Sequence, residues 1–338
     1  MKKIACMGEF LLRMSPEMPG TWIRESTMPV YLGGAEFNVS VALSTWENPV
    51  KYISALPDNS LSADILSEMR LLGIDTSAMQ QSGNRIGIYL LPQGADLKNA
   101  GVIYDRAGSS FAELKPRTIN WKELLGDCSF FHFSAISPAL SRQTADLCLE
   151  AVEAAAELGI SISVDLNYRS KLWKYGVEPV EIMPKLIQHC QLVMGNIWSA
   201  ASLLGAPIDE DIHAKESKQA YLDHASLTAN YIRSISPACK WVANTFRFDT
   251  ENGIRYYASI DTASQQFVSR EFQIRETVDR VGSGDCFMAG LIHGWQNRMN
   301  EQDAVNFAAT AATGKLQEKG DYTRQTVTSI QEKISAHV

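Results

Sequence analysis

Blocks of apolar and polar residues divide the chain into short strands and longer helices. Continuous apolar runs predict strands buried on both faces, at residues 4–7, 50–56, 130–133, 160–164, 192–194 and 240–244. Residues 254–258 and 267–274 predict two late antiparallel strands. Amphipathic or small apolar segments predict helices, at residues 35–46, 61–72, 140–158, 285–295, 304–316 and 327–334, and a mainly polar segment predicts a solvent-facing helix at residues 215–234. Because the two types alternate over most of the chain, we expect an α/β fold. Its central sheet is mostly parallel and lies between two layers of helices.

Two segments do not follow this alternation. Residues 10–34 are mixed in character, and three prolines prevent long helices there. Two strands around a polar loop at residues 94–99 predict a hairpin. We expect both segments to form a small β-sheet lid over the carboxyl edge of the main sheet, where ligands bind in such folds. We therefore expect two parts in the chain. The core comprises residues 1–11, 35–84 and 113–338, and the lid comprises residues 12–34 and 85–112.

Composition narrows the class of protein. The chain has 338 residues, 45% apolar and 20% charged, which is ordinary for a globular protein. Its net charge of −7 argues against nucleic acid and anionic membranes as partners. Apolar runs stay below membrane-spanning length, and Glu9 and Arg13 interrupt the apolar start, so we expect a cytoplasmic protein. The six cysteines are scattered through apolar segments, which is typical of reduced, buried thiols.

The most informative stretch is DRVGSGDCFMAG at residues 279–290. Gly282 and Gly284 permit backbone dihedrals that other residues resist, and an apolar helix follows. Such a loop turns its amide groups toward an anion at the helix N-terminus. Asp285 is then suited to take a proton from a hydroxyl while the amides stabilise negative charge on a phosphoryl group. The alternative is a simple capped helix start.

This stretch resembles the C-terminal signature of the ribokinase/PfkB family of sugar kinases, whose usual form is D-[TR]-x-G-[AGS]-G-D-x-F-x-x-G. The resemblance implies a ribokinase-like α/β/α sandwich with a lid. It also implies ATP and magnesium as cofactors, and the family allows a monovalent cation as well. Asp285 would be the catalytic base, and the amides of Gly282, Ser283 and Gly284 would form the anion hole. The lid in this family often packs against the lid of a second subunit, so we expect a homo-oligomer.

Further motifs extend the resemblance along the chain. Residues 33–38, GGAEFN, resemble the family's G-G-x-x-x-N motif, and residues 165–169, DLNYR, resemble its D-x-N-x-R segment. The implied substrate-binding residues are Gly33, Gly34, Asn38, Tyr89, Tyr104, Arg106, Asn167, Arg169 and Asp285. The implied nucleotide-binding residues are Asn196, Gly282 and Gly284. Thr245 and Arg247 are added from their position, because they follow a predicted strand and could contact the phosphates; the alternative is a surface arginine. Asp165 would hold magnesium indirectly, through water.

Two positions depart from the family pattern. Ser199 stands where N-x-x-E usually supplies a glutamate that organises the magnesium water shell, and a hydroxyl lacks the charge that a hard cation prefers. Arg13 stands where ribokinases use an aspartate to hold sugar hydroxyls. Either Arg13 belongs to a site not built for a neutral pentose, or its side chain points to solvent.

The full set of motifs most resembles the kinases of 2-keto-3-deoxygluconate, also called 2-dehydro-3-deoxy-D-gluconate. Arg106 on the lid and Arg169 after the strand that ends at Asp165 should overhang one cleft, where two guanidinium groups would attract a carboxylate. The implied substrate is therefore a sugar acid, phosphorylated by ATP on its 6-hydroxyl. Two alternatives remain: a fructokinase or another sugar kinase of the family, and a catalytically weak sensor of sugar acids.

Overall fold

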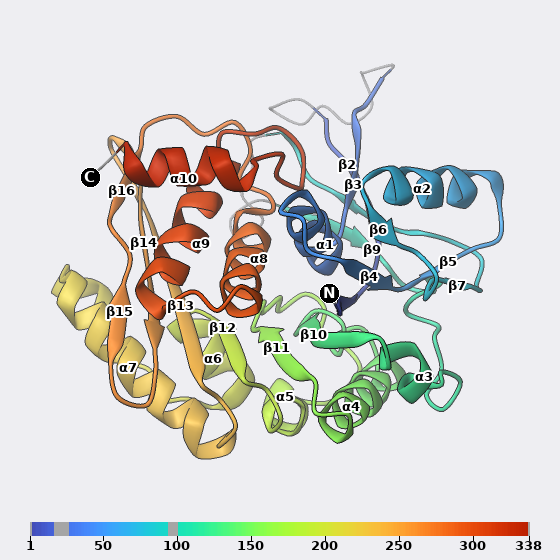
Figure 1. Ribbon diagram of the computed structural model, residues 1–338, viewed down its shortest axis with the longest axis horizontal. Coiled ribbons are helices and arrows are strands. Elements are labelled where there is room, and N and C mark those ends of the chain that lie inside the picture. The colour runs from blue at the N-terminus through green and yellow to red at the C-terminus, as the bar shows by residue number, and fades with distance from the viewer. Residues whose placement is uncertain (1, 17–26, 94–100, 337–338) are drawn as a thin grey trace.

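A ten-stranded sheet forms the centre of the computed structural model, which describes residues 2–16, 27–93 and 101–336 (Figure 1). The strands from β13 to β6 run parallel, whereas β14, β15 and β16 add an antiparallel edge. Their spatial order is β15 (Gln266–Val268), β14 (Gly253–Asp261), β13 (Trp241–Thr250), β12 (Leu192–Gly195), β11 (Ser161–Asp165), β10 (Cys128–Ser134), β1 (Lys3–Met7), β4 (Val50–Ile53) and β6 (Ile74–Asp75), with β16 (Phe272–Ile274) also paired to β14.

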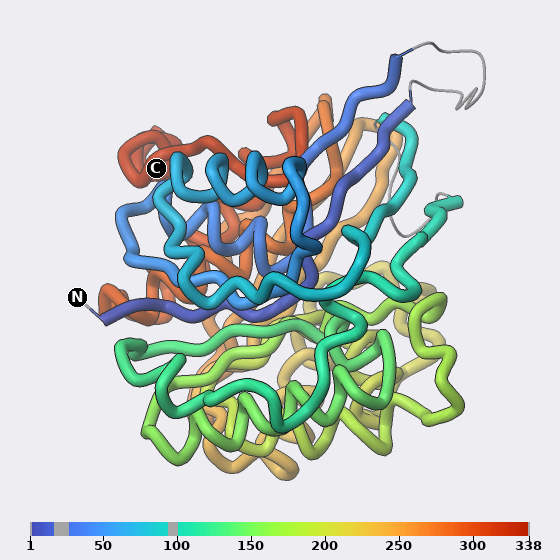
Figure 2. Tube along the Cα trace, turned by 90° about the vertical axis from the view of Figure 1, so that its right-hand side faces the viewer, coloured from blue at the N-terminus to red at the C-terminus, as the bar shows by residue number. Residues whose placement is uncertain are grey.

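Helices cover both faces of this sheet, which gives the three expected layers (Figure 2). One face packs against α1 (Ala35–Thr45), α2 (Ser60–Leu71), α8 (Ser283–Gln296), α9 (Glu301–Lys315) and α10 (Val327–Ser335). The other face packs against α3 (Trp121–Leu125), α4 (Arg142–Glu157), α5 (Pro179–Ile187), α6 (Ile197–Leu204) and α7 (Lys218–Ile235). Burial on both faces explains why the parallel strands are continuous apolar runs instead of alternating ones. All six cysteines are buried with free thiols, as their apolar surroundings predicted.

Small residues between α8 and α9 let these two helices pack closely. A Cβ added to Gly290 would lie 2.5 Å from the Cα of Ala308, which is too close for any side chain at this position. The small residues at 308–314 thus serve helix packing, and they are buried inside the fold.

A separate four-stranded sheet forms the lid. Its order is β3 (Val30–Gly33), β2 (Leu11–Met14), β8 (Gly87–Leu90) and β9 (Ile103–Asp105), so both segments that broke the alternation contribute two strands each. β2 pairs in parallel with β8, and both outer pairs are antiparallel. The predicted loop at residues 94–99 lies outside the described residues, as do residues 17–26.

Several boundaries differ from the prediction. The strand expected at 50–56 is divided at Ser54 into β4 and β5 (Ala55–Leu56), and β5 pairs with β7 (Gln80–Gln81) in a small sheet of its own. The strand expected at 267–274 is likewise divided into β15 and β16. Three helices were not predicted, α3, α5 and α6, and neither was the 3₁₀ turn η1 (Ile212–Lys215). None of the helices in the described part of the chain combines the length and hydropathy that crossing a bilayer requires.

Candidate active site

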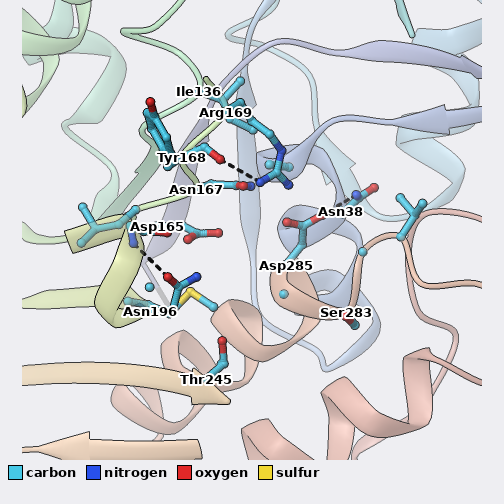
Figure 3. Close-up of a pocket in the computed structure, with 18 of the residues that line it drawn as sticks. Asn38, Ile136, Asp165, Asn167, Tyr168, Arg169, Asn196, Thr245, Ser283 and Asp285 are labelled. Atoms are coloured by element: carbon cyan, nitrogen blue, oxygen red, sulfur yellow. Dashed lines mark hydrogen bonds between the residues drawn. The ribbon is translucent and has the colours of Figure 1, made fainter. Parts of the chain in front are cut away.

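A cavity of about 540 Å³ lies between the carboxyl edge of the main sheet and the lid. It brings together residues that are far apart in the sequence, from the lid, the strand ends and the N-terminus of α8 (Figure 3). The predicted residues that line it are Gly34, Asn38, Tyr89, Tyr104, Arg106, Asp165, Asn167, Arg169, Asn196, Thr245, Arg247, Gly282, Ser283, Gly284 and Asp285. Gly33 is the exception. It is not part of the lining, and a Cβ at this position would lie 2.4 Å from Asp321 Oδ2.

The glycine loop turns directly into α8. Gly282 precedes the helix with φ of 79°, in the left-handed region, and a Cβ there would meet the carbonyl oxygen of Asp321 at 1.7 Å. Asp279 orients the loop, because its Oδ1 accepts a hydrogen bond from the amide of Val281 at 3.1 Å. The first amides of α8 therefore lie beside the cavity without helical acceptors of their own, which is the arrangement that binds anions.

Asp285 lies in the first turn of α8 and is buried. Its Oδ2 accepts a hydrogen bond of 2.6 Å from Nδ2 of Asn38, a residue of α1 (Figure 3). Burial raises the pKa of Asp285 to about 7, and the negative charges of Glu36 and Asp321 act in the same direction. The hydrogen bond from Asn38 and the charge of Arg169 oppose this rise. A carboxylate with a pKa near neutrality is suited to accept a proton during catalysis.

Asp165 ends β11 and is also buried. Burial and the charge of Asp285 raise its pKa, while Arg169 lowers it. Among the described residues the side-chain carboxylate of Asp165 has neither an ion pair nor a hydrogen-bond donor, and it points into the cavity (Figure 3). No group of three or more candidate metal-ligating side chains occurs in the part of the chain that the structure describes. Magnesium fits such a site, since it commonly binds through one or two carboxylates, water and phosphate oxygens.

Asn196 has a structural role as well as its place in the lining. Its side-chain oxygen accepts a hydrogen bond of 2.9 Å from the amide of Ser199 and so caps α6 (Figure 3). Ser199 lies in the lining too, and its hydroxyl cannot replace the charge of the glutamate that is usual at this position.

The lid supplies one wall of the cavity. Tyr89 and Tyr104 face each other across β8 and β9. The hydroxyl of Tyr89 donates to Asp321, and burial raises the pKa of this tyrosine. The prediction for Arg106 needs a correction, because its guanidinium already forms a buried ion pair with Glu9 at 2.5 Å. We expected a substrate carboxylate between Arg106 and Arg169. For Arg106, the carboxylate of Glu9 already takes this place.

Arg169 differs from Arg106. Its Nη1 donates to the backbone carbonyl of Tyr168 at 3.0 Å, and within the described residues it has no carboxylate in ion-pair contact. Lys171, which we did not predict, lies nearby in the lining and donates to the carbonyl of Val102 in the lid at 3.0 Å. Its place two residues after Arg169 was the only signal in the sequence.

Arg13 does not face solvent, so that predicted alternative is wrong. Arg13 is not part of the lining either, and the other alternative, a site not built for a neutral pentose, stays a prediction. Its side chain is fully buried and forms ion pairs with Asp279 at 2.6 Å and with Asp321 at 2.7 Å. The guanidinium carbon also lies 4.5 Å from the ring centre of Tyr31. Arg13 therefore joins lid strand β2 to the loop that holds the α8 amides and to the turn at residues 320–321.

The other end of the cavity is lined by Thr245 and Arg247 of β13, which were predicted, and by Trp198 and Arg280, which were not. Arg280 forms an ion pair of 2.9 Å with Asp249 at the end of β13. Trp198 stacks on His213, with the ring centres 5.1 Å apart. This end combines guanidinium groups with an aromatic surface, a suitable environment for phosphates and a nucleobase.

An α/β/α sandwich with a lid, whose cavity pairs a buried carboxylate with free amides at a helix N-terminus, defines a ribokinase-like phosphotransferase. The sequence model described as "pfkB family carbohydrate kinase" matches residues 1–233 and 250–327. The chain belongs to this family of carbohydrate kinases, as its motifs indicated.

Individual relatives agree with the family. The crystal structure of 2-dehydro-3-deoxygluconokinase from Thermotoga maritima superimposes with a TM-score of 0.89 at 29% identity, covering 99% of this chain and 100% of that one. The 2-dehydro-3-deoxygluconokinase of Bacillus subtilis is 25% identical over 88% of this chain and 84% of its own length. The 2-dehydro-3-deoxygalactonokinase of Haloferax volcanii is 32% identical over 51% of this chain, so the match spans about half (54%) of that relative.

Proposed function

We propose that this protein transfers the γ-phosphoryl group of ATP to the 6-hydroxyl of 2-dehydro-3-deoxy-D-gluconate. The products are the sugar-acid 6-phosphate, ADP and a proton. The observation that carries this proposal is the distribution of charge in the cavity. Arg169 has no carboxylate partner among the described residues and lines the same cavity as Asp285 and the α8 amides. The kinases named above act on sugar acids of this type, which supports the same substrate class here.

Asp285 would act as the general base. In its ionised form it accepts the proton of the 6-hydroxyl while this oxygen attacks the γ-phosphorus. Asn38 holds the carboxylate in place through the 2.6 Å hydrogen bond. The amides of Gly282, Ser283 and Gly284 would stabilise the charge on the transferred group, because they point at the helix N-terminus without other acceptors. The lid residues Tyr89 and Tyr104 would limit the access of water to this group.

The nucleotide would occupy the end of the cavity near Thr245 and Arg247. Asp165 would hold magnesium through water molecules, and the metal would supply positive charge to the phosphates when bound. The position of Asp165 opposite Asp285, with no cation paired to it among the described residues, supports this role. The family also allows a monovalent cation. We assign none of the described residues to it.

The substrate carboxylate would bind to Arg169, with Lys171 close by. Arg106 lines the same wall, and its Nε and Nη2 are in contact with Glu9. Its Nη1 has no protein acceptor in the described part of the chain. Arg106 would therefore help to bind the substrate carboxylate through Nη1 alone. Asn167, Gly34 and the hydroxyl of Tyr104 would contact the chain of the sugar acid.

Arg169→Ala should raise the Michaelis constant for the sugar acid with a smaller effect on turnover. The expected loss is about 1.5–3 kcal/mol of binding, the range for hydrogen bonds to charged groups. ADP release is measured across neutral sugars and sugar acids, with magnesium, for wild type, Arg169→Ala and Arg142→Ala. Arg142 is a suitable control because it is an exposed arginine paired with Asp146 on α4. Normal handling of the acid by Arg169→Ala would contradict the substrate assignment.

The same panel tests the alternatives. Fructose or ribose turned over as efficiently as the acid would favour a neutral-sugar kinase. The sensor alternative depends on Ser199. It would be favoured if the wild type transfers no phosphoryl group to any sugar with magnesium, and Ser199→Glu creates this activity.

We further propose that the lid joins two copies of the chain. Strand alternation puts seven apolar side chains on the lid face opposite the cavity: Leu12, Met14, Val30, Leu32, Ile88, Leu90 and Ile103. Leu12 and Leu32 pack in part against the main core of the same chain. Val30 and Ile103 are about half exposed, at 52% and 51%. A second lid would bury this face, which is larger than isolated exposed side chains account for.

The double variant Val30→Glu, Ile103→Glu should convert the dimer into a monomer, because four charges would enter an apolar interface. Sedimentation or light scattering measures the change in mass. Leu227→Glu is the control, since Leu227 is 64% exposed on α7, away from the lid. A wild type that is monomeric at micromolar concentration would contradict this proposal.

A further inference from the structure

A lysine is buried behind the anion-hole loop, where the proposed mechanism does not use it. Lys315 is the last residue of α9, and its side chain is fully buried. A Cβ built on Gly282 would lie 3.5 Å from Lys315 Cε, so the lysine stem packs against the loop. Lys315 is not part of the cavity lining. Its charge therefore lies on the protein side of the loop and does not contact a ligand.

The surroundings of this ammonium group are unusual for a buried charge. Nζ donates a hydrogen bond to the carbonyl oxygen of Glu318 at 3.1 Å. In the part of the chain that the structure describes it has no ion pair. Burial lowers the pKa of Lys315, while Asp279, Glu318 and Asp321 raise it through their charges. A buried charge without a close partner is costly, so its presence calls for a reason.

The charges behind the loop supply that reason. Asp279 and Asp321 are buried carboxylates that hold the loop and the adjacent turn, through the amide of Val281 and the side chain of Arg13. Arg13 matches one of the two buried carboxylates, and Lys315 matches the other. Half-buried Glu318 adds a third negative charge, which solvent screens in part. Without Lys315, an unmatched buried negative charge would lie directly behind a loop that must attract a phosphoryl group.

We propose that Lys315 is a positioning residue that cancels this charge and so keeps the loop attractive to the transferred phosphoryl group. This inference rests on the proposed phosphoryl transfer and adds a residue to it. Lys315 acts through the loop, by setting the potential at the amides of Gly282, Ser283 and Gly284. The C-terminal end of α9 also favours a cation, which helps to keep this ammonium charged despite burial.

A purely structural role predicts a different behaviour. Removing one charge from a buried cluster destabilises a protein, and most strongly where the lost group is in direct contact with its partners. Lys315 is in ion-pair contact with no described carboxylate, so Lys315→Met should lower the thermal stability less than Arg13→Met does, and it should still lose activity. Arg13 is the contrast, because its guanidinium is in contact with two carboxylates and its loss would leave both unpaired.

The test compares the wild type, Lys315→Met and Lys333→Met in full-length protein. Lys333 is a partly buried lysine of α10 that donates to the side chain of Gln325 at 2.8 Å, so its replacement should leave activity unchanged. Turnover of Lys315→Met should fall by about 10- to 100-fold. This is the factor for one charge at about 6–10 Å with an effective dielectric constant near 20. Michaelis constants should change by less than about threefold.

Two further measurements separate charge from packing. ADP with aluminium fluoride mimics the transferred phosphoryl group, and Lys315→Met should weaken its binding while leaving that of ADP alone unchanged. Lys315→Ala should regain activity with ammonium chloride but not with tetramethylammonium chloride, which is too large for the vacated space.

Each outcome has a definite meaning. Turnover of Lys315→Met within twofold of wild type, or equal losses of aluminium fluoride and ADP binding, would overturn the inference. A large loss of stability with no ammonium rescue would also overturn it, in favour of packing. A wild type that phosphorylates no sugar would refute the proposed function instead, while the aluminium fluoride measurement would still decide the role of Lys315.

Discussion

Asp285→Asn should lower turnover by about 100-fold or more while sugar and ATP still bind. Asparagine keeps the shape of the side chain and its contact with Asn38 but cannot accept the proton of the hydroxyl. The size of the loss follows from the usual contribution of a positioned general base. Steady-state turnover and the binding of both ligands to the variant measure the two parts of this prediction. Near-normal turnover would mean that Asp285 only caps α8.

The pKa of Asp285 adds two checks on the role of this residue, one on the wild type and one on Asp285→Asn. Since the pKa is about 7, kcat/KM of the wild type should fall tenfold per unit below pH 7, as the base becomes protonated. The raised pKa also affects stability. The native state holds this proton more tightly than the unfolded state, so the associated stabilisation is complete below about pH 4 and is lost as the pH rises through 7. Asp285→Asn should therefore unfold at a higher temperature than wild type at pH 8.

Gly282→Ala should abolish activity and destabilise the protein, whereas Gly284→Ala should leave its stability intact. A methyl group at Gly282 would require the left-handed region and would collide with the carbonyl of Asp321, so the loop must move. At Gly284 a Cβ would have nothing within 4 Å. We expect a loss of about 1–3 kcal/mol in unfolding free energy for the first variant, and no loss for the second.

Chemical denaturation measures the two unfolding free energies, and ADP release measures activity. Because Gly284 lines the cavity, its variant tests folding and is no control for turnover. Equal stability of the two alanine variants would show that the contact between Gly282 and Asp321 does not constrain the loop.

The sequence predicted the parts of the site that are carried by local patterns. Residues 165–169 follow a buried strand, and residues 282–285 precede an apolar helix. In a parallel sheet, strand ends and helix starts meet at the same edge. The order of the elements along the chain was therefore enough to predict that these two segments lie in one cavity. The two interrupted strands and the three unpredicted helices were harder, because short elements have too few residues to show a periodicity.

Pairings between distant residues could not be predicted in the same way. Arg13 contacts Asp279, which is 266 positions away, and Arg106 contacts Glu9, which is 97 positions away. No local pattern distinguishes a charged residue that meets a buried partner from one that meets solvent. Arg13 lies on lid strand β2, and Arg106 directly follows lid strand β9. The neighbours of both are set by the lid topology, which depends on parallel pairing between β2 and β8. Which arginines are neutralised by buried carboxylates, and which are left to bind a ligand, therefore became clear only from the folded structure.

The position of Arg13 has a consequence for ATP hydrolysis in the absence of the sugar substrate. Its two ion pairs fasten a lid strand to the glycine loop and to the turn beside it. If β2 swings outward, either these pairs break or the loop follows the strand. In both cases the amides lose their alignment at the moment when bulk water reaches the γ-phosphate. An open molecule would then be a poor ATPase, and the side chain that anchors the lid would also suppress futile hydrolysis.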